Sequence, residues 1–408
     1  MSTPPSGPWP GSPVPTGPGA PAGGTATGTD ARPLDLTKAQ GDRPRPEGPY
    51  GGYTPPAPRM DHRTWAMVLA GVAAVVLLAV VSLLPMPYAL VRPGPVVDVL
   101  SSPDGAPLIT VEGRETYETS GSLDLLTVRV EGGPGTRVGV WEVVRGWLDP
   151  AVAVRPTEEL FPPEVTQEDV DQQNAQEMVT SQETATVAAM GELGVQVPTT
   201  LTVAGFTEGS GAEGALQDGD VVTSVQGTAV VDLPELRDLL QDVEPGDDVT
   251  IGYTRGGTPA EATFPTSEAD GRTVMGVFID PTYDLPFEVS IRIEDIGGPS
   301  AGMIFALGIV DKLTPGEMTG GERIAGTGTM DSDGTVGPIG GIQQKLVGAQ
   351  DAGADWFLAP AGNCAEVVGH VPDGLRVVRV ETLDDARAAV EAIGSQDRTA
   401  VADLPGCG

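Results

Sequence analysis

Residues 297–302 read Gly-Gly-Pro-Ser-Ala-Gly, and residues 338–345 read Pro-Ile-Gly-Gly-Ile-Gln-Gln-Lys. A strand pattern of alternating apolar and polar residues precedes the first stretch, and an apolar helix pattern follows it from about Ser300 to Leu313. The second stretch opens another helix, which extends from Ile342 to about Gly353. Strand and helix patterns continue to alternate beyond it, so the two stretches predict an α/β domain over residues 285–394.

Ser300 stands where a hydroxyl group gains reactivity. Gly297 and Gly298 permit an unusual backbone path before it, and Pro299 presets the entry into the helix. The unpaired backbone N–H groups of a helix N-terminus favour developing negative charge, so this position suits an alkoxide and an oxyanion hole. An isolated serine here would more commonly be a helix N-cap. The glycines before it and the lysine after it favour a nucleophile.

Lys345 is one of only three lysines in the chain, together with Lys38 and Lys312. It lies three residues after Ile342 and four before Ala349, which places it on the apolar face of its helix. A lysine that faces the core should have a lowered pKa, because desolvation disfavours the ammonium form. The neutral amine can then take the proton of a serine hydroxyl. The alternative is a lysine whose ammonium group reaches solvent.

These two stretches resemble the proteolytic domain of the Lon family, whose Ser–Lys dyad lies in Pro-Ser-Ala-Gly and Pro-(Ile/Val)-Gly-Gly-x-x-x-Lys motifs. The resemblance implies that Ser300 is the nucleophile and that Lys345 is the general base. The family also has an active-site threonine in a Thr-Gly pair, and Thr327 stands at the corresponding spacing, 18 residues before the lysine. The resemblance implies that Thr327 forms a hydrogen bond with this lysine.

Two residues depart from the family pattern. Gln344 stands directly before the lysine, where the family often has glutamate, and Gly297 stands three residues before the serine, where the family often has aspartate or another residue. Both departures leave the dyad intact. They bear on the tuning of the pKa of Lys345.

Other catalytic arrangements fit the sequence poorly. A Ser-His-Asp triad would have to use His370, which we interpret as a loop residue, because the only other histidine, His62, precedes the apolar segment described below. No His-Glu-x-x-His zinc motif is present, and Cys364 lacks a convincing base. None of the three lysines stands in the Gly-Lys-Ser/Thr context of a Walker A motif. The sequence therefore predicts a protease that uses no ATP, no cofactor and no metal.

A second pattern covers residues 193–270. The string Gly-Ser-Gly-Ala-Glu-Gly-Ala-Leu at residues 209–216, the Asp-Gly-Asp turn after it and a capped helix starting at Asp232 resemble the PDZ domains of bacterial proteases. PDZ domains bind peptide C-termini by adding a strand to a sheet edge. The resemblance implies a carboxylate-binding loop near residues 193–195, Leu-Gly-Val. The alternative is a small β-rich spacer without a ligand.

The N-terminal part contains one candidate membrane span. Residues 65–84 form a 20-residue run without charge. At about 1.5 Å per helical residue this run matches a hydrocarbon core of about 30 Å. Arg59 and Arg63 precede it, so the positive-inside rule places the N-terminus in the cytoplasm and the remainder outside. A cleaved signal peptide is the alternative, which the long segment before the run disfavours. That segment, residues 1–60, contains 15 Pro and 11 Gly and predicts a disordered tail.

The 408-residue chain carries a net charge of −34, and residues 85–408 contain 17 basic and 52 acidic side chains. So acidic a surface repels phosphate, which argues against nucleic acid as a partner.

The two cysteines, Cys364 and Cys407, form neither a zinc spacing nor a Cys-x-x-Cys pair. In an oxidising compartment they would pair and close the C-terminal tail. Two unpaired thiols are the alternative.

The whole pattern predicts a mixed α/β protein with one transmembrane helix, a small PDZ domain and a C-terminal Lon-type proteolytic domain. This combination resembles the membrane-anchored, ATP-independent Lon-like PDZ proteases of bacteria. It implies a serine endopeptidase of the cell membrane whose catalytic domain lies outside the cytoplasm, with protein or peptide substrates. It also implies a homo-oligomer, since Lon-type domains often form hexamers. The alternative function is a catalytically idle adaptor that binds peptide C-termini. The expected segments are a tail (1–60), a span (65–84), a membrane-proximal α/β segment (88–192), a PDZ domain (193–270), a proteolytic domain (285–394) and a C-terminal tail (395–408).

Overall fold

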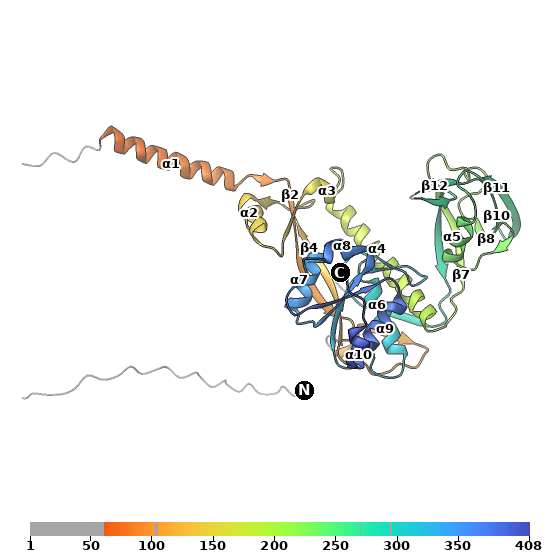
Figure 1. Ribbon diagram of the computed structural model, residues 1–408. Coiled ribbons are helices and arrows are strands. Elements are labelled where there is room, and N and C mark those ends of the chain that lie inside the picture. The colour runs from red at the N-terminus through yellow and green to blue at the C-terminus, as the bar shows by residue number, and fades with distance from the viewer. Residues whose placement is uncertain (1–60, 103–104, 270, 294–295) are drawn as a thin grey trace, which may run out of the picture. The chain divides into compact units, whose positions relative to one another are not determined.

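The computed structural model describes residues 61–408 except residues 103–104, 270 and 294–295, so the tail expected at residues 1–60 lies outside the described residues. Its first element is helix α1 (His62–Ser82), which has 21 residues and a mean hydropathy of 2.5 (Figure 1). None of its residues is buried. Within the described residues it is the one helix long and apolar enough to cross a membrane.

One of the two six-stranded sheets joins two parts of the chain that are far apart in the sequence. Strand β4 (Ser122–Glu131) lies at its centre, where it pairs in parallel with β16 (Arg323–Gly326) and antiparallel with β2 (Tyr88–Asp98). The full order is β20-β19-β16-β4-β2-β6, with β19 at Trp356–Pro360, β20 at Arg376–Val380 and β6 at Ala153–Pro156. Residues 88–192, expected as a membrane-proximal segment, therefore build half of the sheet that the C-terminal residues complete.

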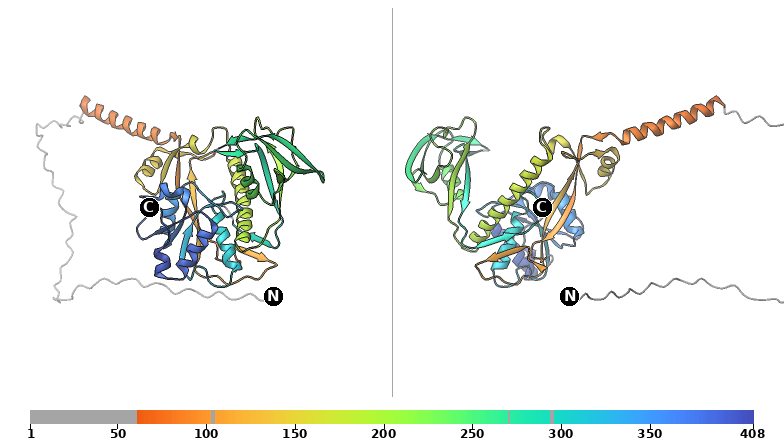
Figure 2. Two further views of the ribbon diagram at one scale, coloured as in Figure 1. Left: turned by 45° about the vertical axis from the view of Figure 1, so that its right-hand side comes forward. Right: turned by 180° about the vertical axis from the view of Figure 1, so that it is seen from behind.

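Helices cover both faces of this sheet. On one face lie α4 (Gln167–Glu192), α6 (Gly302–Leu313) and α9 (Leu383–Gly394), whose apolar side chains form one core with strand residues such as Leu123 and Leu125. On the other face α7 (Ile342–Asp351) packs against strand residues such as Leu126 and Phe357. Figures 1 and 2 show α4, in yellow-green, as the long helix on the face that it shares with α6 and α9. We call this assembly the three-layer domain, and it confirms the predicted mixed α/β fold.

The other six-stranded sheet lies in the chain between α4 and strand β15 (Glu288–Ile291), and we call the part that contains it the inserted domain (residues 199–283). Its order is β11-β10-β8-β7-β14, and its core contains Leu236 and Leu240 of helix α5 (Leu233–Gln241). As the sequence predicts, the Asp232 side chain caps α5 by accepting a hydrogen bond from the backbone N–H of Glu235. The strands are β7 at Thr199–Phe206, β8 at Val221–Val225, β9 at Thr228–Ala229 on β8, β10 at Asp248–Arg255, β11 at Thr258–Pro265, β14 at Val277–Tyr283, and the hairpin β12 (Ser267–Ala269) and β13 (Arg272–Val274).

Short elements complete the three-layer domain. Strand β3 (Ile109–Glu112) pairs with β15, and β17 (Thr329–Met330) pairs with β18 (Val336–Gly337). The others are β1 (Pro85–Met86), β5 (Val138–Gly139), α2 (Val140–Leu148), α3 (Thr157–Leu160), the 3-10 turn at Ala361–Asn363, α8 (Cys364–Val367) and α10 (Arg398–Ala402).

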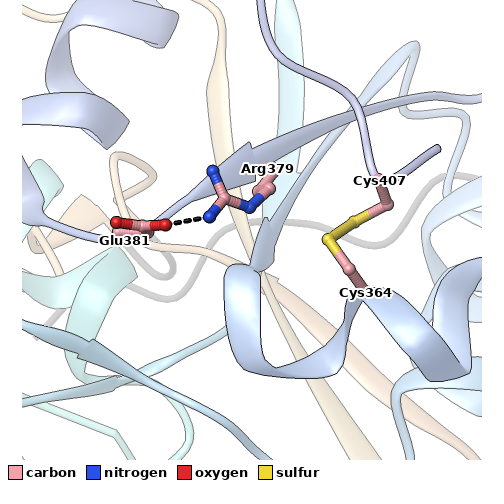
Figure 3. The surroundings of a disulfide bond; sticks show 4 residues. All are labelled: Cys364, Arg379, Glu381 and Cys407. Atoms are coloured by element: carbon pink, nitrogen blue, oxygen red, sulfur yellow. Dashed lines mark hydrogen bonds and ion pairs between the residues drawn. A yellow bond between two sulfur atoms is a disulfide. The ribbon is translucent and has the colours of Figure 1, made fainter.

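A disulfide bond between Cys364 and Cys407 ties the C-terminal tail to α8 (Figure 3). Of the two states that the sequence left open, the structure has the paired one. The tail also accepts a backbone hydrogen bond at 2.8 Å, from the N–H of Arg379 to the carbonyl of Pro405. The C-terminal tail is therefore fastened beside strand β20.

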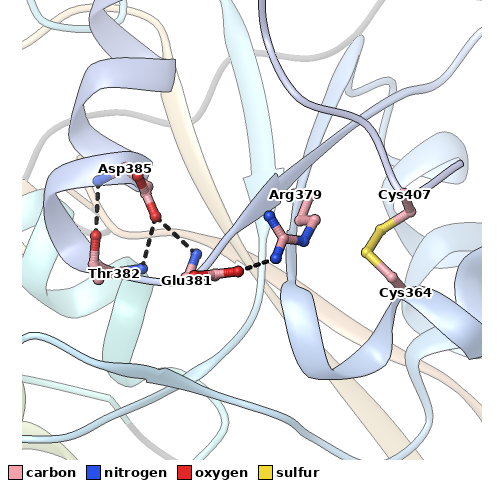
Figure 4. A network of polar contacts seen from close by, with 6 residues as sticks. All are labelled: Cys364, Arg379, Glu381, Thr382, Asp385 and Cys407. Atoms are coloured by element: carbon pink, nitrogen blue, oxygen red, sulfur yellow. Dashed lines mark hydrogen bonds and ion pairs between the residues drawn. A yellow bond between two sulfur atoms is a disulfide. The ribbon is translucent and has the colours of Figure 1, made fainter.

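A polar network fixes the passage from β20 into α9 (Figure 4). The Asp385 carboxylate accepts hydrogen bonds from the backbone N–H groups of Glu381 and Thr382, each at 3.1 Å, and the Thr382 hydroxyl accepts one from the N–H of Asp385. This reciprocal cap satisfies N–H groups that the first turn of a helix leaves unpaired. Arg379 forms an ion pair with Glu381 beside it.

Candidate active site

Ser300 lies in the turn that joins β15 to α6. The helix begins at Gly302 with Ala301 as its N-cap, two residues later than the start at Ser300 that the sequence predicts, so the serine lies just before the helix. The turn is held against α4, because the N–H of Gly298 donates a hydrogen bond of 3.0 Å to the carbonyl of Asn174. Ser300 is half-buried.

The structure explains why position 297 is a glycine, which the sequence does not reveal. A Cβ atom at this position would come within 2.6 Å of the Cβ of Asn174, which is closer than carbon atoms approach without a clash. The side chain that the family often carries here would therefore collide with α4. Gly297 allows α4 to press against the turn that carries the serine.

Lys345 projects from α7 into the space between Ser300 and Thr327. Its Nζ lies 2.7 Å from the Oγ of Ser300 and 2.8 Å from the Oγ1 of Thr327. The side chain is 1% exposed. Burial lowers the pKa of Lys345 from 10.5 to about 7, and desolvation is the only cause, with no charged group acting on it. The lysine thus faces the core, as its helical position predicts.

The entry into α7 depends on the second glycine of the Gly-Gly pair. Gly341 is the N-cap of α7 and has left-handed backbone angles, φ 72° and ψ 29°. This conformation is costly for residues with a side chain, and a Cβ here would also lie 2.8 Å from the side chain of Val128. Gly341 therefore aims the first turn of α7, and with it Lys345, towards the serine.

Thr327 is fully buried and connects the serine with the lysine. Its hydroxyl donates a hydrogen bond of 2.9 Å to the backbone carbonyl of Ser300 and accepts one from Lys345. The backbone N–H of Gly328 donates to the same carbonyl at 3.0 Å. These two donors fix the backbone of Ser300, so the three residues expected at the site lie together.

The structure assigns the remaining sequence candidates to other places. His370 is exposed in the loop after α8, where its ring contacts Gln343. Cys364 is bonded to Cys407 and has no free thiol. Within the described residues, no three His, Cys, Asp or Glu side chains gather closely enough to hold a metal ion.

The loop at residues 193–195 does not have the free N–H groups that a carboxylate site needs. The N–H groups of Leu193, Gly194 and Val195 donate to carbonyl groups in the last turn of α4, at Ala189, Gly191 and Met190. Leu193 also packs against the core of the three-layer domain. This segment is the C-terminal cap of α4, so the placement of a carboxylate-binding loop here is wrong.

The sequence did not reveal the contribution of α4 to the site. The hydroxyl of Ser181 donates a hydrogen bond of 3.1 Å to the carbonyl of Pro299, the residue before the serine. A cleft of about 240 Å³ opens beside Pro299, lined by Gln176, Glu177, Thr180, Ser181, Thr184, Pro299, Thr329, Met330 and Asp331. The signal in the sequence is a set of small residues at helical spacing, Ser181, Ala185, Ala188 and Ala189, which indicates close helix packing. All four are buried in α4.

Comparisons with known proteins match the two domains separately. Residues 294–391 match the model of the Lon protease (S16) C-terminal proteolytic domain, and residues 180–266 match a PDZ domain model. Ser300, Thr327 and Lys345 all lie in the first match.

Curated relatives match the same C-terminal region. Lon protease of Campylobacter concisus is 34% identical over 107 residues, which are 25% of this chain and 13% of the relative. Lon protease 1 of Sorangium cellulosum is 37% identical over 111 residues, 26% of this chain and 13% of the relative. The chain thus spans only about 13% of the length of these relatives.

One solved structure, the PDZ domain of an SdrC-like protein from Listeria innocua, is 26% identical. It covers 20% of this chain and 92% of that one with a TM-score of 0.19, which supports no further conclusion.

Proposed function

We propose that this chain, which carries a Lon-type proteolytic domain and a PDZ domain, is a membrane-anchored serine endopeptidase that works without ATP. Ser300 is the nucleophile, Lys345 the general base and Thr327 the residue that orients the lysine. The observation that carries the proposal is the position of the buried Lys345 Nζ, which lies within 2.8 Å of both hydroxyl oxygens.

The hydrogen bonds among Ser300, Thr327 and Lys345 define which group is the donor in each contact. The proton of Thr327 is used in the bond to the Ser300 carbonyl, so its oxygen accepts a hydrogen from Lys345. At a pKa of about 7 a large fraction of Lys345 is neutral near pH 7. The neutral amine has one lone pair, and the Ser300 hydroxyl can donate its hydrogen to it across the 2.7 Å contact.

The reaction follows from this arrangement. The Oγ of Ser300 attacks the carbonyl carbon of the peptide bond while its proton moves to the Nζ of Lys345. The resulting ammonium group gives the proton to the nitrogen of the leaving amine, and the C–N bond breaks. Water then attacks the acyl carbon and loses a proton to Lys345. The bond between that carbon and the Oγ of Ser300 breaks, the acid product leaves, and Lys345 returns the proton to Oγ, which restores the serine hydroxyl and the neutral amine.

Backbone donors beside the serine would hold the oxyanion. Among the described residues, the N–H groups of Ser300 and Ala301 have no hydrogen-bond acceptor, and both lie at the N-terminal end of α6. Donors at such an end stabilise negative charge that develops in the transition state. The contacts of the Ser300 carbonyl with Thr327 and Gly328 hold these donors in place.

Membrane anchoring rests on α1, whose apolar surface is wholly exposed. Arg59 and Arg63 precede the uncharged run 65–84 of this segment, which favours a cytoplasmic N-terminus and a catalytic domain outside the cytoplasm. The disulfide between Cys364 and Cys407 supports the same placement, since such bonds persist in oxidising compartments. The absence of a Walker A lysine supports independence from ATP.

The PDZ domain would bind substrates or regulate access to Ser300. Strand addition needs a free sheet edge, and β11 and β14 are the two edge strands of the inserted domain. Peptides or protein segments that pair with one of these edges are the ligands that this architecture suits. A homo-oligomer remains an expectation from the Lon family.

A serine-reactive phosphonate probe tests the proposal directly. We expect it to label the folded wild-type protein and to fail with Ser300→Ala and Lys345→Met. Ser290→Ala is the matched control, because Ser290 is exposed in β15 and its side chain is not used in the site. Labelling that survives Ser300→Ala would disprove the nucleophile. A folded wild-type protein that is neither labelled nor able to cut peptides would favour the idle adaptor.

A further inference from the structure

Helix α2 exposes an apolar face. Its residues Val143 and Gly146 are buried, whereas the exposed Trp141, Arg145 and Leu148 and the half-buried Val144 lie on the opposite side of the helix, and we call these four residues the exposed stripe. Trp141 is 49% exposed and Leu148 is 80% exposed. Single exposed apolar side chains are ordinary, but a tryptophan and a leucine on one helical face indicate a surface that is covered in use.

This face adjoins the end of α1. The indole N–H of Trp141 donates a hydrogen bond of 2.8 Å to the hydroxyl of Ser82, the last residue of α1. The strand that leads into α2 pairs with the strand that leaves α1, with Pro85 opposite Gly139 and Met86 opposite Val138. Figure 1 shows α2 beside this junction. The exposed stripe is therefore fixed at the point where the apolar helix ends.

The depth of Trp141 follows if α1 spans a bilayer. A helix of 21 residues is about 31 Å long, so Ser82 would lie at the boundary between acyl chains and headgroups. Tryptophan suits this boundary, because its ring is apolar and its N–H is polar. Trp65 stands near the other end of α1, whereas the C-terminal end has no aromatic residue of its own. Trp141 supplies one from α2.

The chemistry of the rest of the stripe matches the same boundary. Val144 and Leu148 would contact acyl chains, and the exposed Arg145 can extend towards lipid phosphate groups. Leu83 and Leu84, which follow α1, are 84% and 52% exposed and enlarge the apolar surface. A short amphipathic helix of this kind lies in the plane of a membrane surface.

We propose that α2 is an interfacial helix, whose exposed stripe inserts into the headgroup–acyl boundary of the bilayer that α1 crosses. This inference rests on the membrane anchoring of the proposed function. The opposite face of α2 packs on the sheet that carries the active site, since a Cβ at Gly146 would lie 3.0 Å or less from side chains of Val154 and Leu90. Lipid contact by α2 thereby sets the orientation of that sheet to the membrane.

Tryptophan quenching by brominated phosphatidylcholine tests the inference on the full-length protein in vesicles. Bromine near the headgroup end of the acyl chains should quench a component of the fluorescence that disappears in Trp141→Phe. Trp356→Phe is the matched control, because Trp356 lies in β19 and is 7% exposed, and its removal should leave that component unchanged. Leu148→Glu places a charge in the stripe at an 80% exposed position, so it should reduce the same component at least twofold without unfolding the protein.

The outcomes distinguish failure of the interfacial-helix proposal for α2 from failure of membrane anchoring by α1. A protein that resists carbonate extraction but shows the same lipid quenching in Trp141→Phe as in wild type would overturn the interfacial helix and leave the anchor intact. Protection of Trp141 from an aqueous quencher without quenching by lipid would point to a protein partner and also overturn it. A protein that carbonate extracts from the vesicles would overturn both.

Discussion

Replacing Lys345 by methionine should abolish hydrolysis and, at pH 8, make the folded protein more stable. The pKa of Lys345 is about 7 in the folded state against 10.5 for an unburied lysine. Between these values the unfolded chain holds a proton that the folded chain gives up. The stability associated with this group is complete above pH 10.5 and decreases as the pH falls towards 7.

The size of the effect follows from this difference. At pH 8 the lysine must lose its proton when the chain folds, and this costs about 3 kcal/mol, because each pKa unit corresponds to about 1.4 kcal/mol. Methionine removes this cost of deprotonation but also removes the hydrogen bonds to Ser300 and Thr327, which together contribute about 2 kcal/mol. The net gain is therefore about 1 kcal/mol at pH 8, and it changes sign near about pH 9.

Guanidinium unfolding of the full-length protein in detergent, repeated from pH 7 to pH 9.5, measures this difference. Lys312→Met is a control for the loss of a lysine side chain elsewhere in the same domain. A stability difference between wild type and Lys345→Met that stays constant across this range would refute the reasoning. So would a variant that is less stable than wild type at pH 7.

Four further outcomes follow from the same geometry. The kcat/KM for a short peptide should rise through about pH 7 as Lys345 loses its proton, and Lys345→Arg should be inactive throughout because guanidinium stays charged; activity that is flat from pH 5 to 8 would contradict this. Thr327→Val keeps the shape but loses both hydrogen bonds of the hydroxyl, so kcat should fall about 10- to 100-fold in a steady-state assay. Burial raises the pKa of Asp311 from 3.8 to about 6, so ionisation of this carboxyl group destabilises the fold as the pH rises through this range; Asp311→Asn should then raise the unfolding free energy by about 3 kcal/mol at pH 7.5 and leave it unchanged at pH 3.5, as denaturant titration can measure. Cys407→Ser opens a loop with a sequence separation of 43 and should lower the unfolding free energy by about 2–4 kcal/mol, and a reductant should lower it in wild type but not in the variant.

The positions of Ser300 and Lys345 in their elements were predictable because the signals for them are local. Two glycines and a proline mark the turn before Ser300, and the spacing from Ile342 to Ala349 places Lys345 on a buried face. Both features depend on backbone geometry within one turn of a helix, which a short stretch of sequence determines. The helices α6 and α7 accordingly appear close to their predicted positions.

The partners of these residues were not predictable, because they come from pairing between distant segments. The buried run of β4 has the composition of a central strand, but nothing in it specifies that β16 is its neighbour. For the same reason the sequence did not reveal that Asn174 and Ser181 of α4 hold the turn of the serine. Residues 193–195 resemble a binding loop by position, whereas their N–H groups complete a helix end.

The inserted domain leaves and re-enters the three-layer domain at a single point. The N–H of Asp284 donates a hydrogen bond of 2.9 Å to the carbonyl of Pro198, so the outgoing and returning chains are in direct contact. A domain attached in this way can be removed or replaced as a unit, since a short turn can close the gap that its removal leaves. Under the proposed function, exchange of this domain would change which substrates are bound and leave Ser300 and Lys345 untouched, so one proteolytic domain could acquire new substrates.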